Sequence, residues 1–172
     1  MNSDVLAPQT STDVRDLFIH FPPFDCRIIS RIIPHRHPFL LPDGITEFTH
    51  DGVKGFKNIS ISDPVFQGHF PGEPVYPGVL QIETVAQIGA CWILARKENV
   101  GKIAYLMSVE EAKFRRAVTP GMRLDVVGKI TNLKSRTGRL SAEVLVDGKV
   151  VSNVTILFAF QRGESDSASG NG

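Results

Sequence analysis

The second half of the chain alternates between apolar and polar positions with the period of a β-strand. Over residues 139–146, Leu, Ala and Val alternate with Arg, Ser and Glu, which predicts one buried and one solvent-facing side. Turn-forming residues separate such stretches, and Asp147-Gly148 is a strong two-residue hairpin signal. We therefore expect antiparallel strands over 103–109, 112–118, 122–133, 139–146 and 150–160, with turns at Pro120-Gly121, Thr137-Gly138 and Asp147-Gly148.

One long apolar segment precedes these strands and lacks their alternation. From Pro77 onward, VLQIETVAQIGACWILARK predicts a single helix that ends near Asn99. Apolar positions surround most of its circumference, so we expect a helix buried on nearly all sides. Arg96 and Lys97 would lie in its last turn, where positive charge suits the helix dipole.

The N-terminal part of the chain contains shorter elements. A helix is predicted over 25–33, with Asp25 as its N-cap, and a strand over 52–61. Residues 35–43 are rich in proline and predict either an irregular buried loop or a proline-limited strand. Between 63 and 78, three prolines and three glycines predict a loop of defined shape.

Together these elements predict one α+β domain. One helix that is apolar all round needs covering, and an antiparallel sheet of five or six strands can curl around it. At 172 residues the chain suits a single domain, which we place at 16–161. The polar segments 1–15 and 162–172 are predicted to be mobile tails.

Charge and cysteine content narrow the function classes. The net charge of +1 gives no general attraction to nucleic acid or to an anionic membrane. The two cysteines, Cys26 and Cys91, form no disulfide framework, and Cys91 is predicted to be a small buried hydrophobe. Acidic residues near the N-terminus argue against a targeting signal, and no apolar stretch is long enough for a membrane span. We therefore expect a cytoplasmic protein without membrane insertion.

Glu83 is the first candidate for chemistry, because it is the only charged residue between Glu73 and Arg96. A carboxylate in an apolar helix must be partnered or kept protonated, and a protonated carboxyl group can act as a general acid. Gln87, one turn later, could hold that carboxyl group. The alternative is an acid that faces solvent through a gap in the sheet, or faces a partner subunit.

His69 and the start of the long helix complete the candidate site. Glycines and prolines around His69 restrict its backbone, and an imidazole can accept a proton near neutral pH. Gly78 and Val79 would present unpaired backbone amides at the positive end of the helix dipole, where they could polarise a thioester carbonyl. The alternatives are that His69 is structural or merely exposed, and that Pro77-Gly78 only begins a helix. Together, His69, Glu83 and the helix start supply the base, the acid and the carbonyl site that elimination of water from a 3-hydroxyacyl thioester requires.

Two further clusters carry weaker signals. His35-Arg36-His37 offers two imidazoles, but no Asp, Glu or Cys stands at ligand spacing, so we predict no metal. The basic cluster, which we define as Lys113, Arg115 and Arg116, is either an ordinary solvated surface or a docking surface for an acidic carrier protein.

Several motifs resemble one known family. IPHRHPFLL at 33–41, FQGHFPGEPVYPGVL at 66–80, ETVAQ at 83–87 and AKFRRAV at 112–118 are similar to the hot-dog-fold 3-hydroxyacyl-acyl-carrier-protein dehydratases of the FabZ type. The resemblance covers about 22–160. It implies a long central helix wrapped by a curved antiparallel β-sheet, no cofactor, and acyl carrier protein as partner.

The resemblance also implies roles for particular residues. His69 would be the catalytic base and Glu83 the acid, with Gly78 donating to the thioester carbonyl. Val75 would accept a hydrogen bond from the histidine through its backbone, and Gln87 would hold Glu83. The implied assembly is a homodimer, often a trimer of dimers, whose sites combine His69 of one chain with Glu83 of the other. Candidates for lining the acyl tunnel are Phe66, Phe70, Tyr105 and Phe114.

Three positions depart from the family's usual pattern. His37 stands where tyrosine is usual, Pro42-Asp43-Gly44 replaces the usual Val-Asp-Arg, and Ala117 replaces a proline. These lie outside the acid/base pair. The alternatives to fatty-acid synthesis are the same dehydration in a specialised lipid or polyketide pathway, and a non-catalytic hot-dog subunit that binds acyl chains. A thioesterase fits the residue pair less well.

Overall fold

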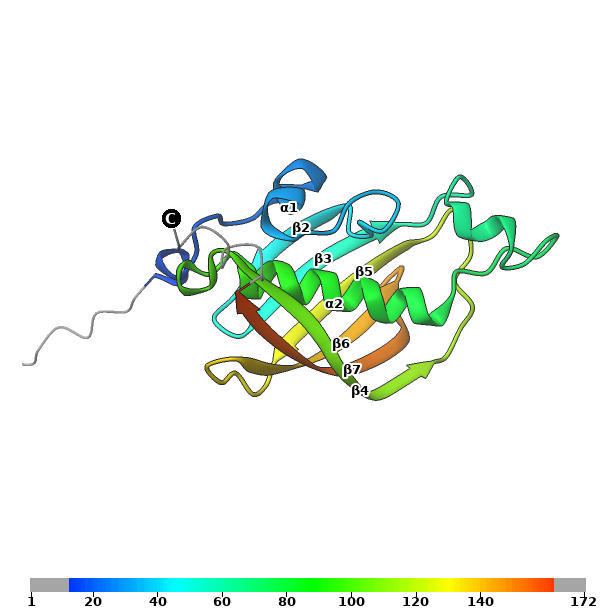
Figure 1. Ribbon diagram of the computed structural model, residues 1–172. Coiled ribbons are helices and arrows are strands. Elements are labelled where there is room, and N and C mark those ends of the chain that lie inside the picture. The colour runs from blue at the N-terminus through cyan, green and yellow to red at the C-terminus, as the bar shows by residue number, and fades with distance from the viewer. Residues whose placement is uncertain (1–12, 163–172) are drawn as a thin grey trace, which may run out of the picture.

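A long helix lies in the concave side of a curved antiparallel sheet (Figure 1). The computed structural model describes residues 13–162. Helix α2 (Gly78–Leu94) runs along the sheet, whose seven strands follow the order β1-β2-β3-β5-β6-β7-β4. The strands are β1 (Phe24–Asp25), β2 (Gly44–Phe48), β3 (Gly52–Asn58), β4 (Lys102–Phe114), β5 (Arg123–Ile130), β6 (Thr137–Val146) and β7 (Lys149–Arg162). The predicted α+β architecture is confirmed.

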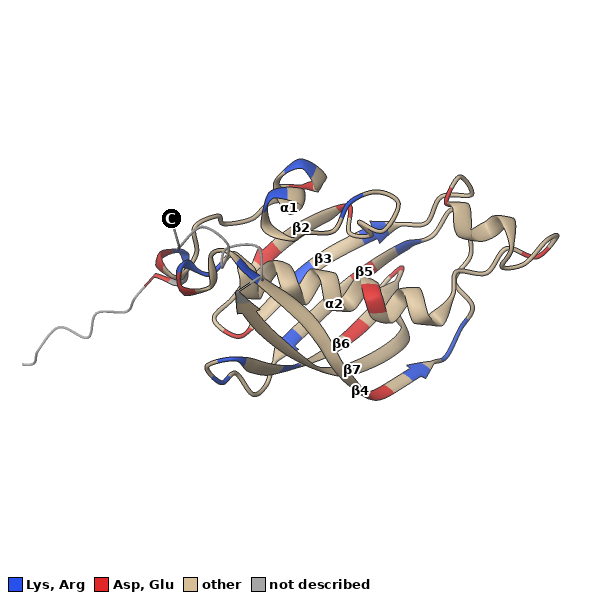
Figure 2. Cartoon of the chain, in the orientation of Figure 1, with Lys and Arg blue, Asp and Glu red and all other residues tan. Residues whose placement is uncertain are grey.

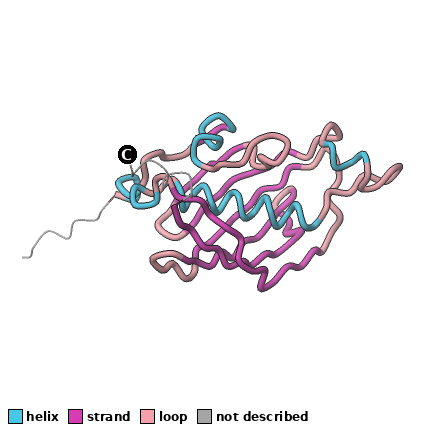
Figure 3. Tube along the Cα trace, viewed as in Figure 1, coloured by secondary structure: helices cyan, strands magenta, loops and turns pink. Residues whose placement is uncertain are grey.

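The sheet packs closely on the helix because β6 turns small and branched apolar side chains inward and α2 has a glycine where they meet. In β6, the alternate residues Leu140, Ala142 and Val144 are buried and face inward. A Cβ atom at Gly89 of α2 would lie 2.5 Å from Leu140 Cδ2, so glycine at this position permits the close approach. The tube in Figure 3 shows the strands passing around the helix from β2 to β4.

A helix-capping residue and a two-residue turn in the sequence predicted two elements correctly. Helix α1 (Cys26–Ile32) begins where predicted, and the Asp25 carboxylate accepts hydrogen bonds from the amides of Arg27 and Ile28 at 3.0 and 3.2 Å. The β6–β7 hairpin turns at Asp147 and Gly148, whose φ angles of 50° and 72° are both positive.

The C-terminal end of α2 differs from the prediction. The helix ends at Leu94, so Arg96 and Lys97 lie beyond its last turn rather than in it. Tertiary contacts are made at the helix end instead. The amide of Ile19 donates to the Ala95 carbonyl at 2.9 Å, and the guanidinium of Arg96 lies 4.8 Å from the centre of the Trp92 ring. Burial also begins late, because Val79 in the first turn is 70% exposed.

The strand boundaries were partly wrong. One continuous strand, β4, replaces the predicted pair 103–109 and 112–118, and it ends at Phe114. Its register against β7 shifts twice, between Leu106 and Ser108 and between Val109 and Glu111, and these irregularities change which side alternate residues face. Strands β1 and β2 were not predicted, and the Thr137-Gly138 pair opens β6 instead of forming a turn.

Other predictions concern burial and the chain ends. Cys91 is fully buried as predicted, and burial raises the pKa of its thiol. Among the described residues, no helix is long and apolar enough to cross a membrane. Most of the two predicted tails lies outside the described residues, and residues Val14–Leu17 form a short 3-10 helix.

Candidate active site

Glu83 lies in the second turn of α2, and its carboxyl group is held by Gln87 one turn later. Gln87 Nε2 donates to Glu83 Oε1 at 2.8 Å. The spacing of four residues places both side chains on one side of the helix. The Glu83 side chain is 21% exposed, so it is half-buried rather than sealed in the core. Figure 2 shows acidic colour on α2, whose one acidic residue in the sequence is Glu83.

Gln87 also attaches the acid to a loop far away in the sequence. The same Nε2 donates to the Phe39 carbonyl at 2.8 Å, and Gln87 Oε1 accepts from the Leu41 amide at 2.9 Å. Both amide hydrogens and the carbonyl oxygen are therefore used, in a side chain that is 1% exposed. This leaves the amide one orientation, and the orientation of Glu83 follows from it.

His35 is the second residue beside the acid, and sequence reasoning missed it. Its Nε2 lies 3.5 Å from Glu83 Oε1, the oxygen that Gln87 also binds. The other ring nitrogen, Nδ1, is buried and has no hydrogen-bond partner among the described residues. In the sequence His35 stands out as half of a histidine pair, and nothing in its spacing links it to Glu83, 48 residues later.

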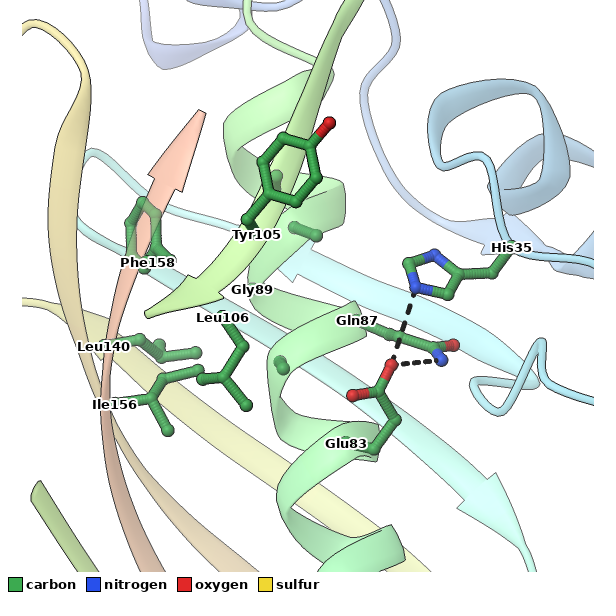
Figure 4. Close-up of a pocket in the computed structure, with 12 residues that line it drawn as sticks. His35, Glu83, Gln87, Gly89, Tyr105, Leu106, Leu140, Ile156 and Phe158 are labelled. Carbon is green, nitrogen blue, oxygen red and sulfur yellow. Dashed lines mark hydrogen bonds and ion pairs between the residues drawn. The ribbon is translucent and has the colours of Figure 1, made fainter. Parts of the chain in front are cut away.

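A pocket of about 190 Å³ opens beside this acid (Figure 4). His35, Glu83 and Gln87 form its polar side, and Tyr105 is part of its wall. The rest of the lining is apolar: Ala86, Gly89, Ala90, Ala104, Leu106, Leu140, Ile156 and Phe158. A polar end on an apolar pocket suits a functional group that carries a hydrocarbon chain.

His69 occupies a turn whose backbone hydrogen bonds fix the imidazole. Its Nδ1 lies 2.6 Å from the Val75 carbonyl oxygen, and its own carbonyl accepts from the Val75 amide at 3.1 Å. A carbonyl can only accept, so Nδ1 carries the hydrogen and Nε2 presents its lone pair. The His69 ring is stacked on Phe70 at 3.9 Å. This tautomer is the one that a general base at Nε2 requires.

The two phenylalanines predicted to contact substrate differ in environment. Phe66 belongs to the 3-10 helix Pro64–Gln67, is 7% exposed, and packs against Tyr76 in the hydrophobic core. Phe70 is 53% exposed and covers one side of the His69 ring. Within this chain, Phe66 supports the His69 turn, and Phe70 is accessible to a ligand.

The start of α2 presents backbone amides as predicted. Gly78 and Val79 are its first two residues, so neither amide has a carbonyl one turn earlier in the helix. A pocket of about 310 Å³ lies beside Gly78 and is lined by Phe114, Arg115 and Arg116, among others. A Cβ atom at Gly78 would lie 2.8 Å from the Phe114 ring, so only glycine leaves room for this approach.

The base and the acid are not brought together within one chain. No hydrogen bond or ion pair among residues 13–162 joins His69 to Glu83, and His69 does not line the pocket that Glu83 lines. The turn that carries His69 extends beyond the N-terminal end of α2 in Figure 1. We call the surroundings of Glu83 the acid half of the candidate site and the turn around His69 its base half.

The described residues offer no cluster of three or more His, Cys, Asp or Glu side chains that could hold a metal ion. His35, from the pair considered as metal ligands, faces Glu83 instead.

Comparison with known proteins gives consistent matches. The model of the FabA-like domain matches residues 33–155. A 3-hydroxyacyl-[acyl-carrier-protein] dehydratase FabZ of Clostridium botulinum is 47% identical over 135 residues, which cover 78% of this chain and 94% of that protein. The FabZ of Caldicellulosiruptor saccharolyticus is 42% identical over 139 residues, covering 80% and 99% of the two chains.

Solved structures share the fold at low sequence identity. The dehydratase heterocomplex ApeI:P from Xenorhabdus doucetiae matches with a TM-score of 0.69 at 18% identity, covering 85% of this chain and 95% of that one. A mutant thioesterase from Pseudomonas aeruginosa matches with a TM-score of 0.62 at 16% identity, covering 84% and 97%. Both dehydratases and thioesterases thus use this arrangement of helix and sheet.

Proposed function

The chain belongs to the FabZ family of 3-hydroxyacyl-[acyl-carrier-protein] dehydratases, and we propose that it converts (3R)-3-hydroxyacyl thioesters on acyl carrier protein to trans-2-enoyl thioesters in fatty-acid biosynthesis. One observation carries the chemistry. Glu83 is fixed by Gln87 at the polar end of an apolar pocket, in a chain whose His69 presents a free Nε2 lone pair.

The reaction assigns one step to each group. His69 Nε2 takes the proton from C2, and the charge that develops on the thioester oxygen is stabilised by the amides of Gly78 and Val79. The C2–C3 double bond forms as the C3–O bond breaks. Glu83 donates its proton to the departing hydroxyl group, which leaves as water. Atoms and electrons balance without a redox partner, so the proposal includes no cofactor.

The separation of the two halves within one chain supports a site that is shared between chains. We assign each active site to His69 of one chain and Glu83 of a second copy, within a homodimer that can assemble further into a trimer of dimers. The edge of β4 suits such pairing, because this 13-residue strand is hydrogen-bonded on one side only and exposes Tyr105, Met107 and Val109.

The carrier protein would approach along the basic cluster. Arg115 and Arg116 line the pocket beside Gly78, at the start of α2 where the thioester carbonyl would bind. Lys113 extends the charge along β4, although its ammonium also meets Glu111 at 2.7 Å. Figure 2 shows these basic residues at the end of β4 and in the loop after it. An acidic carrier docked there would deliver its acyl chain to the helix start.

Hydration of a crotonyl thioester on acyl carrier protein provides the direct test. Purified protein should remove the absorbance of the conjugated enoyl thioester, and a 3-hydroxybutyryl thioester should restore it from the other direction. No change in either direction, under conditions where an established dehydratase works, would reject the enzyme and favour a non-catalytic acyl-binding subunit. Release of free thiol would indicate thioester hydrolysis instead.

A further inference from the structure

The environment of Glu83 distinguishes its two carboxyl oxygens. Oε1 has two nitrogen neighbours, Gln87 Nε2 at 2.8 Å and His35 Nε2 at 3.5 Å. No hydrogen bond from residues 13–162 reaches Oε2. In Figure 4, Oε2 points away from His35 and Gln87, toward the side of the pocket where Leu106 and Ile156 lie. One oxygen is anchored, and the other faces the space for substrate.

The different neighbours of the two oxygens indicate which oxygen carries the acidic proton. The Gln87 amide can only donate to Oε1, so Oε1 is an acceptor and the proton of a neutral Glu83 resides on Oε2. Oε2 is also the oxygen that faces the pocket. When Glu83 gives up this proton, negative charge spreads to Oε1, where both nitrogen neighbours lie. Donors at that oxygen stabilise the product of proton transfer more than its starting state.

The imidazole of His35 is suited to be the second donor. Nδ1 is buried without a partner among the described residues, and a bare Nε2 would set its lone pair against that of Oε1, which accepts hydrogen bonds. The hydrogen therefore belongs on Nε2, which faces Oε1. At 3.5 Å the contact is long for a hydrogen bond, and such contacts commonly shorten when substrate binds.

The loop around His35 restricts the ring's position. The Arg36 guanidinium donates to the carbonyls of Ile33 and His35 at 3.0 and 2.7 Å, and the Phe39 amide closes a turn on the Arg36 carbonyl at 2.8 Å. Gln87 then binds Phe39 and Leu41 on the far side of that turn. The loop and the acid are therefore connected both through Gln87 and through His35.

We propose that His35 is a positioning residue for proton donation: its Nε2–H, together with the Gln87 amide, holds Oε1 of Glu83, directs the acidic proton on Oε2 toward the departing 3-hydroxyl group, and stabilises the carboxylate that forms. This inference rests on the proposed dehydratase activity and deepens it. It gives His35 no contact with the reacting atoms, and it makes the effect of His35 depend on whether the leaving group needs a proton.

The test compares two leaving groups in the full-length protein. A 3-hydroxybutyryl thioester needs a general acid, whereas a 3-chlorobutyryl thioester loses chloride unprotonated after removal of the C2 proton. His35→Leu, of similar size but without a donor, should lower kcat on the hydroxy substrate by about 10- to 100-fold, with KM changing less than about threefold. On the chloro substrate its rate should stay within about threefold of wild type. His69→Ala should be slow on both.

A second variant separates the donor from the packing. His35→Gln can place an amide donor near the position of Nε2, and we expect it to recover most of the kcat lost in His35→Leu. Thermal unfolding of both variants should match wild type within a few degrees. Equal losses on both substrates, a His35→Gln protein as slow as His35→Leu, or a His35→Leu protein as fast as wild type would each overturn the inference. An inactive wild-type protein would instead reject the dehydratase proposal itself.

Discussion

The acid half and the base half of the site are built in contrasting ways. Glu83 lies on a 17-residue helix, and Gln87 connects it to the 39–41 segment through a buried side chain. His69 lies in an irregular turn and is oriented by a single backbone carbonyl. Its neighbour Phe70 is half exposed, whereas Ile88 and Cys91, which follow Gln87 on α2, are fully buried.

The difference indicates what each half needs from the rest of the molecule. A proton donor must be kept in one orientation at the end of a pocket, and a helix with a fixed side-chain partner does this within one chain. A base that reaches into another subunit must project outward, and a turn with a defined backbone can do so. In the proposed homodimer the acid half is thus complete in one chain, and the base half would be directed toward the partner.

The largest effect is expected when the proposed base or the proposed acid is replaced, one at a time. His69→Ala and Glu83→Gln should each lower kcat by about 10²- to 10⁴-fold, because each removes one proton transfer. Enoyl thioester absorbance measures this. His50→Ala, at an exposed position, and Glu47→Gln, at a partly buried one paired with Lys54, are matched controls outside either half, and they should keep wild-type activity. Near-normal turnover in either of the first two variants would contradict its assigned role.

Mixing those two inactive variants tests whether the halves lie in different chains. After unfolding and refolding together, about half of the dimers are mixed, and each has one intact site of two. The mixture should therefore recover about a quarter of the wild-type rate. Mixed dimers that are demonstrated by mass spectrometry but stay inactive would show that both groups act within the same chain.

Gln87→Leu tests the rigidity of the acid half. It leaves the Leu41 amide, the Phe39 carbonyl and Glu83 without their partner, so the free energy of unfolding should fall by about 1–3 kcal/mol and kcat by about tenfold or more. Urea unfolding and steady-state rates measure the two effects. Asn99→Leu is the matched control, because Asn99 is also a buried amide but donates to the Ile93 carbonyl near the C-terminal end of α2, away from both pockets. It should lose stability while keeping kcat.

Gly72→Ala tests the base half, whose turn depends on backbone conformation. Gly72 has φ of 83° with nothing near its Cβ position, so alanine adds backbone strain of about 1 kcal/mol and no clash. We expect kcat to fall severalfold as the His69 turn shifts. Gly148→Ala has equivalent strain at φ of 72° in the β6–β7 hairpin, and it should destabilise equally without changing kcat. Equal activity in both variants would mean that the turn is not tuned for catalysis.

Tyr76 lies between the two halves. Its ionisation should have the smallest effect, because it changes the free energy of unfolding only well above neutral pH. Tyr76 follows Val75, and its hydroxyl lies 3.4 Å from Thr84 beside the acid. Burial, partly offset by this hydrogen bond, raises the pKa of Tyr76 from 10.0 to about 12. The folded state then holds a proton that the unfolded state releases, so stability should be unaffected below pH 10 and fall between about 10 and 12.

Phenolate absorbance in a Tyr105→Phe background isolates this group, because the chain has two tyrosines. Ionisation of Tyr76 near its ordinary pKa, with the protein still folded, would show that the region between the halves is open to solvent.

Local signals were sufficient for the long helix, the Asp25 cap and the hairpin at Asp147-Gly148, because each depends on residues adjacent in sequence. Signals of the same local kind selected Glu83 and His69 as candidates, since an isolated acid in an apolar helix and a histidine among turn residues are visible in the chain itself. The end of α2 was misplaced because Ile19, Trp92 and Arg96 meet there only in the folded protein. Strand β4 was divided in two because bulges disturb its alternation.

What the sequence determined by itself was the class of the domain and the choice of Glu83 and His69 as the candidate acid and base, since these rest on local composition and spacing. Only the tertiary structure decided which groups face each other. It brought His35 to Glu83, joined Gln87 to the segment around Phe39, and kept His69 apart from the acid within one chain. Contacts between side chains 48 residues apart depend on how the loop folds over the helix, and no periodicity along the chain encodes that.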